Sequence, residues 1–116
     1  MAIYSNLPVY KAALDLFAKV FQACKNMERD VKFTIGERLH NEIIELELNV
    51  YRANCTEDAD KKVTCIGKTR ENLETVRLLL RLLQELKHLK EEVFVDLNVD
   101  IEGISKQLVG WQRSTK

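Results

Sequence analysis

Two short patterns in the sequence pair a glutamate with a histidine three residues later, Glu37–His40 and Glu85–His88. In a four-helix bundle, two such pairs together with two further glutamates can hold a di-iron centre. His40, however, precedes the expected turn between the second and third helices by about fifteen residues, and His88 follows that turn by about thirty. At about 1.5 Å of rise per residue, the two histidines would lie roughly 24 Å apart along the bundle. We therefore predict no metal site and no cofactor, with both pairs on solvated helix faces.

The three cysteines are the other side chains that could act as nucleophiles. Cys24 falls on an apolar stripe, where a buried thiol behaves as a small hydrophobic group, and neither Cys55 nor Cys65 has a histidine nearby in the sequence. The chain also has no Gly-rich phosphate loop, and its carboxylates form no isolated pair that would face the interior. We predict a non-enzymatic protein with no catalytic residues.

Cysteine usage and hydropathy also indicate a cellular compartment. An odd number of cysteines without a Cys-x-x-Cys pair is typical of reduced thiols in the cytosol. The first residues lack the basic segment and the long apolar segment of an export signal. The longest apolar runs are a few residues, far short of a bilayer span. We predict a cytoplasmic protein that does not enter the membrane.

Apolar residues recur every three or four positions along almost the whole chain, which is the period of amphipathic helices. This period predicts helices at about 8–26, 28–54, 57–89 and 91–113. The short connections between them make consecutive helices antiparallel neighbours. Since 116 residues suffice for one domain, we predict a single all-α domain over 1–116, an antiparallel up-down-up-down four-helix bundle.

Each predicted helix carries a main apolar stripe. The stripes of the first, second and fourth helices are Tyr10, Ala13, Leu14, Phe17, Val20, Phe21 and Cys24, then Ile35, Leu39, Ile43, Leu46, Val50 and Ala53, then Val93, Leu97, Ile101, Ile104, Leu108 and Trp111. The stretch 93–101 also alternates with the period of two that is typical of strands. The helical period continues to Trp111, whereas the alternation stops at Ile101, and a single strand would have no partner. We therefore predict a helix there.

The second and third helices carry more apolar residues than one bundle core can bury. The third helix has leucines and valines over an arc of about 220°, whereas a core-facing stripe is on the order of 100° wide. Either these side chains form a subunit interface, or the monomer has a wider core and the helix directions differ by a third of a turn. We predict the interface, formed by Phe33, Ile44, Leu48, Tyr51, Leu78 and Leu82.

Charge is distributed unevenly although the formal net charge is zero. Residues 61–90 contain eight basic residues and three acidic ones. Six of the basic residues form the predicted nucleic-acid-binding set: Lys61, Lys62, Lys68, Arg70, Arg77 and Arg81. This set either contacts phosphates, repeated around an oligomer, or is a solvated face stabilised by pairs such as Arg70–Glu74 and Arg81–Glu85.

Three segments resemble a known family: Val31–Leu39, Arg77–Lys87 and Ile104–Trp111. They are similar to the start of helix two, to the third helix and to the closing Gly-Trp segment of bacterial four-helix-bundle proteins. That family includes proteins encoded in intervening sequences of 23S ribosomal RNA genes, the "ribosomal protein S23" type, and the accessory variability proteins of diversity-generating retroelements. The similarity extends from about Tyr10 to Ser114.

The resemblance implies an up-down four-helix bundle that assembles as a ring-like homopentamer. For the retroelement branch it also implies binding of RNA or DNA and partnership with a reverse transcriptase. The family offers no catalytic residues. Two functional hypotheses follow: a homo-oligomeric accessory factor that binds nucleic acid, or the same oligomer acting as a protein–protein scaffold.

Overall fold

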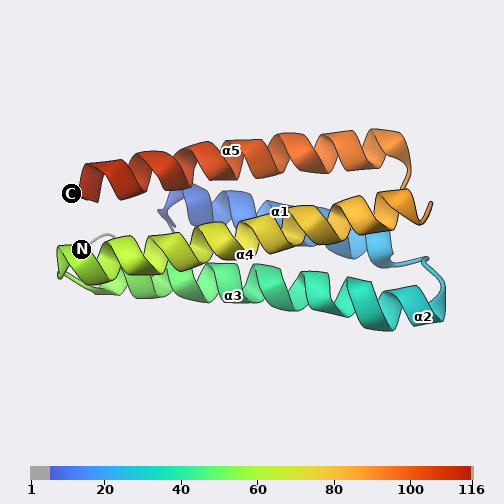
Figure 1. The fold of residues 1–116 in the computed structure, drawn as a ribbon, viewed down its shortest axis with the longest axis horizontal. Helices are drawn as coiled ribbons and strands as arrows, with labels where there is room; N and C mark the ends of the chain where they lie inside the picture. The colour runs from blue at the N-terminus through green and yellow to red at the C-terminus, as the bar shows by residue number, and fades with distance from the viewer. Residues whose placement is uncertain (1–5, 116) are drawn as a thin grey trace.

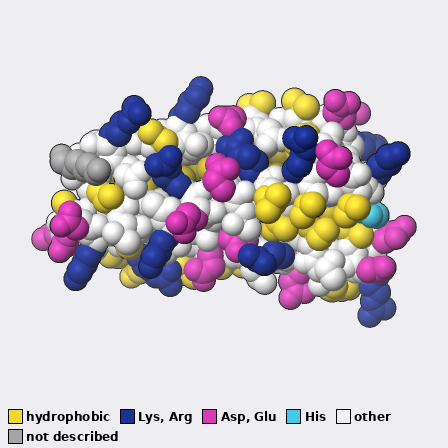
Figure 2. Space-filling view, in the orientation of Figure 1, with side chains coloured by type: hydrophobic (Ala, Val, Ile, Leu, Met, Phe, Trp, Pro, Cys, Tyr) yellow, Lys and Arg dark blue, Asp and Glu magenta, His cyan; other side chains and the backbone are white. Residues whose placement is uncertain are grey.

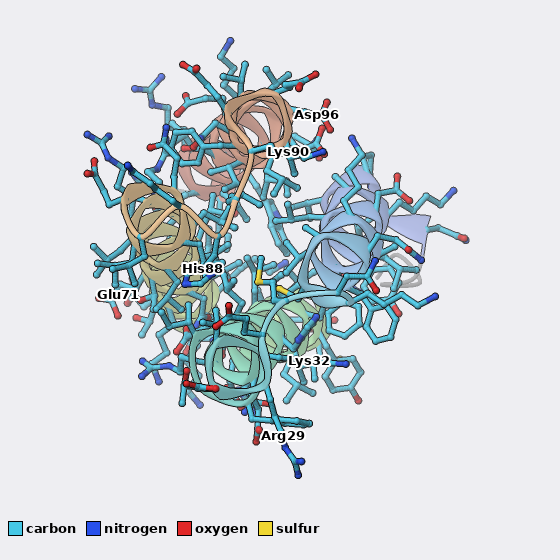
Figure 3. The ribbon with its side chains drawn as sticks, turned by 90° about the vertical axis from the view of Figure 1, so that its right-hand side faces the viewer. Arg29, Lys32, Glu71, His88, Lys90 and Asp96 are labelled. Carbon is cyan, nitrogen blue, oxygen red and sulfur yellow. The ribbon has the colours of Figure 1, made fainter. Side chains whose placement is uncertain are left out.

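The computed structural model describes residues 6–115, which form a bundle of four long helices without strands (Figure 1). The helical elements are α1 Pro8–Cys24, α2 Arg29–Val31, the π-helical turn η2 Lys32–Gly36, α3 Glu37–Cys55, α4 Ala59–Glu85 and α5 Glu91–Thr115. α1 and α4 each lie beside α3 and α5, so that α1 and α4 occupy opposite corners of a roughly square cross-section (Figure 3). The predicted all-α antiparallel four-helix bundle is confirmed.

The first helix begins with Pro8 at its first helical position, where the missing N–H leaves no hydrogen bond unmade. Its buried side chains are Val9, Ala13, Leu16, Val20 and Cys24. The predicted stripe is therefore displaced around the helix. Leu14 and Phe21, which were expected within it, are about half exposed, because α3 packs beside them and leaves their outer edge in solvent.

The second long helix runs without interruption from α2 through η2 into α3. Gly36 ends the π-helical turn and is buried, and a Cβ added there would lie 3.6 Å from the Sγ atom of Cys24, where α1 ends. The stripe predicted for this helix faces the core as expected, since Leu39, Ile43, Leu46, Val50 and Ala53 are all fully buried.

The third long helix, α4, is capped by a side chain at its start and by a backbone reversal at its end. The carboxylate of Asp58 accepts hydrogen bonds from the backbone N–H groups of Asp60 (2.9 Å) and Lys61 (3.1 Å), which the helix itself cannot satisfy. The helix ends at Glu85, four residues before the predicted end at residue 89. Lys87 takes a left-handed conformation with φ 64°, which turns the chain toward α5.

The fourth helix contains the stretch for which a strand was the alternative, and that stretch is helical throughout. Leu97, Ile101, Ile104 and Leu108 are buried, as the helical period predicts. No helix within residues 6–115 has both the length and the apolarity needed to cross a membrane.

A partly buried polar network links α3 and α4. The side-chain amide of Asn49 donates to the Asn72 side-chain oxygen (2.9 Å), and the Asn72 amide donates to the Glu42 carboxylate (3.1 Å). Arg52 donates to the side-chain oxygen of Asn49 (2.9 Å). Because buried amides lose free energy when unpaired, this network specifies how α3 and α4 align along the bundle.

Candidate assembly surfaces

All six residues predicted to form the subunit interface are exposed on the single chain, with 41–58% of each residue accessible to solvent. The alternative of a wider monomer core is therefore wrong for these positions. The structure also adds residues that the pattern did not assign to an interface, namely Leu14, Phe21, Leu86, Val95 and Val99. The apolar surplus of the sequence lies at the surface of the protomer.

Exposed apolar residues of α3 and of α1 together line a groove of about 540 Å³, which we call the α1/α3 groove. Its lining residues are Tyr10, Leu14, Phe17, Ile43, Ile44, Glu47, Leu48 and Tyr51. Ile44, Leu48 and Tyr51 belong to the predicted interface, whereas the α1 contribution was assigned to the core in the sequence interpretation. A concave, mostly apolar surface of this size is typical of a binding site.

Glu47 is the one acidic residue among those that line the groove. Both of its carboxyl oxygens are buried, and neither has a hydrogen-bond partner among the described residues. Burial disfavours the charged carboxylate and raises the pKa of Glu47 to about 8. Buried polar groups are nearly always hydrogen-bonded, so this carboxyl group marks a place where a donor is missing.

His40 lies two turns before Glu47 on the same edge of α3. Its ring makes edge-to-face contacts with Phe17 (5.0 Å between centroids) and Phe21 (5.8 Å) of α1. A hydrogen bond to the backbone of Gly36 engages the ring, but the dominant effect is burial, which lowers the His40 pKa. Its Nε2 atom is buried without a partner. The histidine of the first Glu-x-x-His pattern thus packs against aromatic rings.

The α4 part of the surplus forms a separate surface. Leu78, Leu82 and Leu86 follow one another at every fourth position and are all exposed. Figure 2 shows a cluster of hydrophobic side chains over the C-terminal half of α4, bordered by charged groups. We call Leu78, Leu82 and Leu86 the α4 ridge.

Polar residues separate the two surfaces. On the face of α3 that turns toward solvent between groove and ridge, Arg52 forms an ion pair with Glu45 (3.8 Å) and Arg38 forms one with Glu42 (3.2 Å). The groove belongs to the α1 side of α3, and the ridge belongs to α4 at the opposite corner (Figure 3). The protomer therefore presents two distinct apolar surfaces.

The arginines of the predicted nucleic-acid-binding set are all held by side chains of the same chain. Arg77 contacts both Glu102 of α5 and Glu74, and Arg81 contacts Glu85 (3.1 Å), the pair expected from the sequence. The expected Arg70–Glu74 pair does not form. Arg70 instead donates to Gln112 of α5 (2.7 Å). These contacts describe a solvated helix face with internal charge pairing.

The lysines of that set are placed differently. Lys61 and Lys68 are exposed and Lys62 is half-buried in the N-terminal half of α4. Within residues 6–115, none of the three forms an ion pair. They are the members of the set with charge available for an external anion.

No group of three or more His, Cys, Asp or Glu side chains within the described residues is arranged to hold a metal ion. The cysteines are unbridged, and burial raises the pKa of Cys24, which makes its thiol less reactive.

No protein-family model and no curated protein sequence matches the chain. Among solved structures, the fold is similar to that of a protein of unknown function from the S23 ribosomal protein family of Bacteroides thetaiotaomicron. The TM-score is 0.82 at 15% sequence identity, over 96% of this chain and 99% of that chain. The resemblance expected from the three sequence segments is thus confirmed in the fold: the chain is built as a four-helix bundle like that member of the S23 ribosomal protein family.

Proposed function

We propose that the chain is a non-enzymatic assembly protein that associates with copies of itself through the apolar side chains exposed on α1, α3 and α4. The observation that carries this proposal is the pair of surfaces described above, the α1/α3 groove and the α4 ridge. Burying one Leu or Ile side chain is worth about 1.5–3 kcal/mol, so leaving this many in water is unfavourable. Contiguous apolar patches of this kind typically mark association sites.

A single substitution in the groove tests the proposal. In sedimentation experiments, the parent should be multimeric, and Leu48→Glu should sediment as a smaller particle with unchanged helical circular dichroism. Asn41→Glu introduces the same charge on an exposed polar position of α3 and should behave as the parent. If the parent sediments as a single folded 13.5 kDa chain at micromolar concentrations, self-association is refuted.

The number of copies is a finer proposal. We propose a ring of five, which rests on the family resemblance of the three sequence segments. Native mass spectrometry of the parent measures this number directly, and any other single dominant stoichiometry would contradict the ring of five while leaving self-association in place.

Nucleic-acid binding is a second candidate function, favoured by the three lysines of α4 that lack ion-pair partners. In an oligomer, Lys61, Lys62 and Lys68 of every copy would contribute to one phosphate-binding surface. Binding of structured RNA at low salt should weaken steeply as salt rises, and Lys61→Ala/Lys62→Ala/Lys68→Ala should abolish it. Lys106→Ala changes an exposed α5 residue that forms no ion pair within residues 6–115, and it is the control. Absence of binding at low salt would leave the protein–protein scaffold as the function, and partnership with a reverse transcriptase stays a prediction from the resemblance.

A further inference from the structure

Two helices of this chain carry the same arrangement of apolar and charged residues with opposite charge. In each, a charged residue has an apolar residue three positions before it and another directly after it. The two sets are Ile44, Glu47 and Leu48 on α3, and Leu78, Arg81 and Leu82 on α4. Since residues three apart lie on neighbouring turns of one helix face, the charged residue of each set lies beside the apolar residue that precedes it.

The α3 set is incomplete on its own. The Glu47 carboxyl group is buried at the groove, both oxygens lack a donor, and no cation forms an ion pair with it within residues 6–115. A leucine at this position would avoid burying an unpaired polar group. The groove therefore fits an occupant that brings both apolar area and a strong hydrogen-bond donor.

The α4 set supplies both. Leu78 and Leu82 are exposed, and Arg81 beside them has Glu85 on its own helix as its ion-pair partner. Both members of that pair are more than 60% exposed, so solvent screens the attraction and Arg81 can exchange partners readily. A guanidinium group is also the cation best suited to a carboxylate, because it can donate two parallel hydrogen bonds.

We infer that the α4 ridge of one copy docks in the α1/α3 groove of the next copy, where Arg81 donates to Glu47. This inference rests on the proposed self-association and names the surfaces that meet. Leu78 and Leu82 cover the apolar lining contributed by Ile44 and Leu48, and the buried carboxyl group gains the donor that it lacks within one chain.

The position of the two surfaces fixes the kind of assembly. The groove is lined by α1 and α3 and the ridge lies on α4, and α1 and α4 occupy opposite corners of the bundle (Figure 3), so a copy that receives a ridge in its groove still has its own ridge exposed. Contacts between two different surfaces continue head to tail, and they close into a ring when the rotation between copies permits.

A mixing experiment tests this arrangement. Leu48→Glu blocks the groove and keeps the ridge, whereas Leu82→Glu blocks the ridge and keeps the groove. Each variant alone should sediment as a monomer, and an equimolar mixture should form a 1:1 heterodimer, because one intact ridge meets one intact groove. If the parent itself is monomeric, the proposed function fails. If the parent assembles but the mixture stays monomeric, or Leu82→Glu alone keeps the parent's mass, only the present inference is overturned.

A charge exchange tests the contact between the two charged side chains. Glu47→Arg and Arg81→Glu should each weaken association at least about 30-fold, since each places like charges together in the contact. The double variant should recover most of the affinity. Glu45→Arg combined with Arg81→Glu is the matched control, since Glu45 is an exposed α3 residue outside the groove, and it should recover none. Circular dichroism verifies folding. If Glu47→Arg unfolds, Glu47→Gln is measured alone in its place; it should weaken association by less than Arg81→Glu does, and unchanged association would overturn the contact. A double variant as weak as the weaker single variant would overturn the contact.

Discussion

Glu47 should make the stability of the protomer depend on pH, and this dependence can be predicted with its sign. Burial raises the pKa of Glu47 from 4.5 to about 8, so the folded chain holds a proton on this group over a range in which the unfolded chain has released it. The associated stability is fully present below about pH 4.5, falls as the pH rises, and is lost once the pH exceeds 8.

The magnitude follows from the pKa difference. Each pH unit between the two values is worth about 1.4 kcal/mol, which sets an upper limit of about 5 kcal/mol. The Glu47 side chain is only half-buried, and solvent reaching it reduces the effect, so we expect a loss of about 2 kcal/mol between pH 5 and pH 9. Glu47→Gln should remove this loss, because a glutamine has no proton to release.

The measurement is urea denaturation at pH 5, 7 and 9 in the Leu82→Glu background, which keeps the groove empty and the chain monomeric. The difference in free energy of unfolding between Leu82→Glu/Glu47→Gln and Leu82→Glu should shift with pH. Between pH 5 and pH 9 it should move by about 2 kcal/mol in favour of Leu82→Glu/Glu47→Gln. Glu45→Gln in the same background changes an exposed carboxylate and should leave the pH dependence as it is. If Leu82→Glu shows the same pH dependence with and without the Glu47→Gln substitution, the assignment of a buried, unpaired acid is refuted.

Three further predictions concern the bundle itself. Asn49→Ala should lower the free energy of unfolding by about 1–3 kcal/mol, measured in urea, because Asn72 then loses its buried partner. Gly103→Ala and Gly110→Ala should each raise the free energy of unfolding by about 0.5–1 kcal/mol, which is measured as a higher melting temperature. Both glycines lie within α5, and a methyl group there meets nothing within 4 Å. Lys87→Gly should stabilise the chain by up to about 1 kcal/mol, because a glycine adopts the left-handed conformation at this helix end without strain; unchanged or lower stability would contradict this reading of the cap.

The sequence predicts the four helices well because their apolar period is sustained for many turns. The core stripes of α3 and α5 face inward as expected, from Leu39 to Ala53 and from Leu97 to Leu108. The end of α4 is less predictable. Leu89 is apolar, so the sequence pattern predicts that the helix continues to it. In the structure the chain reverses at Lys87, and Leu89 is buried in the core although it lies beyond the end of the helix.

The surface of α1 shows why the candidate site could only be predicted in part. Its apolar residues cover more of the helix than the core needs, and the pattern alone does not decide whether Leu14 or Leu16 faces inward. That choice depends on where α3 packs, and the structure buries Leu16 and leaves Leu14 at the groove. Glu47 carries no sequence signal for the same reason: its burial comes from α1, which is distant along the chain.

The structure also changes what a salt titration of nucleic-acid binding should show. If all six predicted basic residues contacted phosphates of duplex DNA, the logarithm of the binding constant would fall with the logarithm of salt with a slope of about −5 per bound protomer. Arg70, Arg77 and Arg81 are engaged with side chains of their own chain, and docking of the α4 ridge would occupy Arg81 further. Only the three lysines then remain to replace counterions, and the slope falls to about −3. A slope of about −5 would show instead that arginines of the set leave their side-chain partners for phosphates.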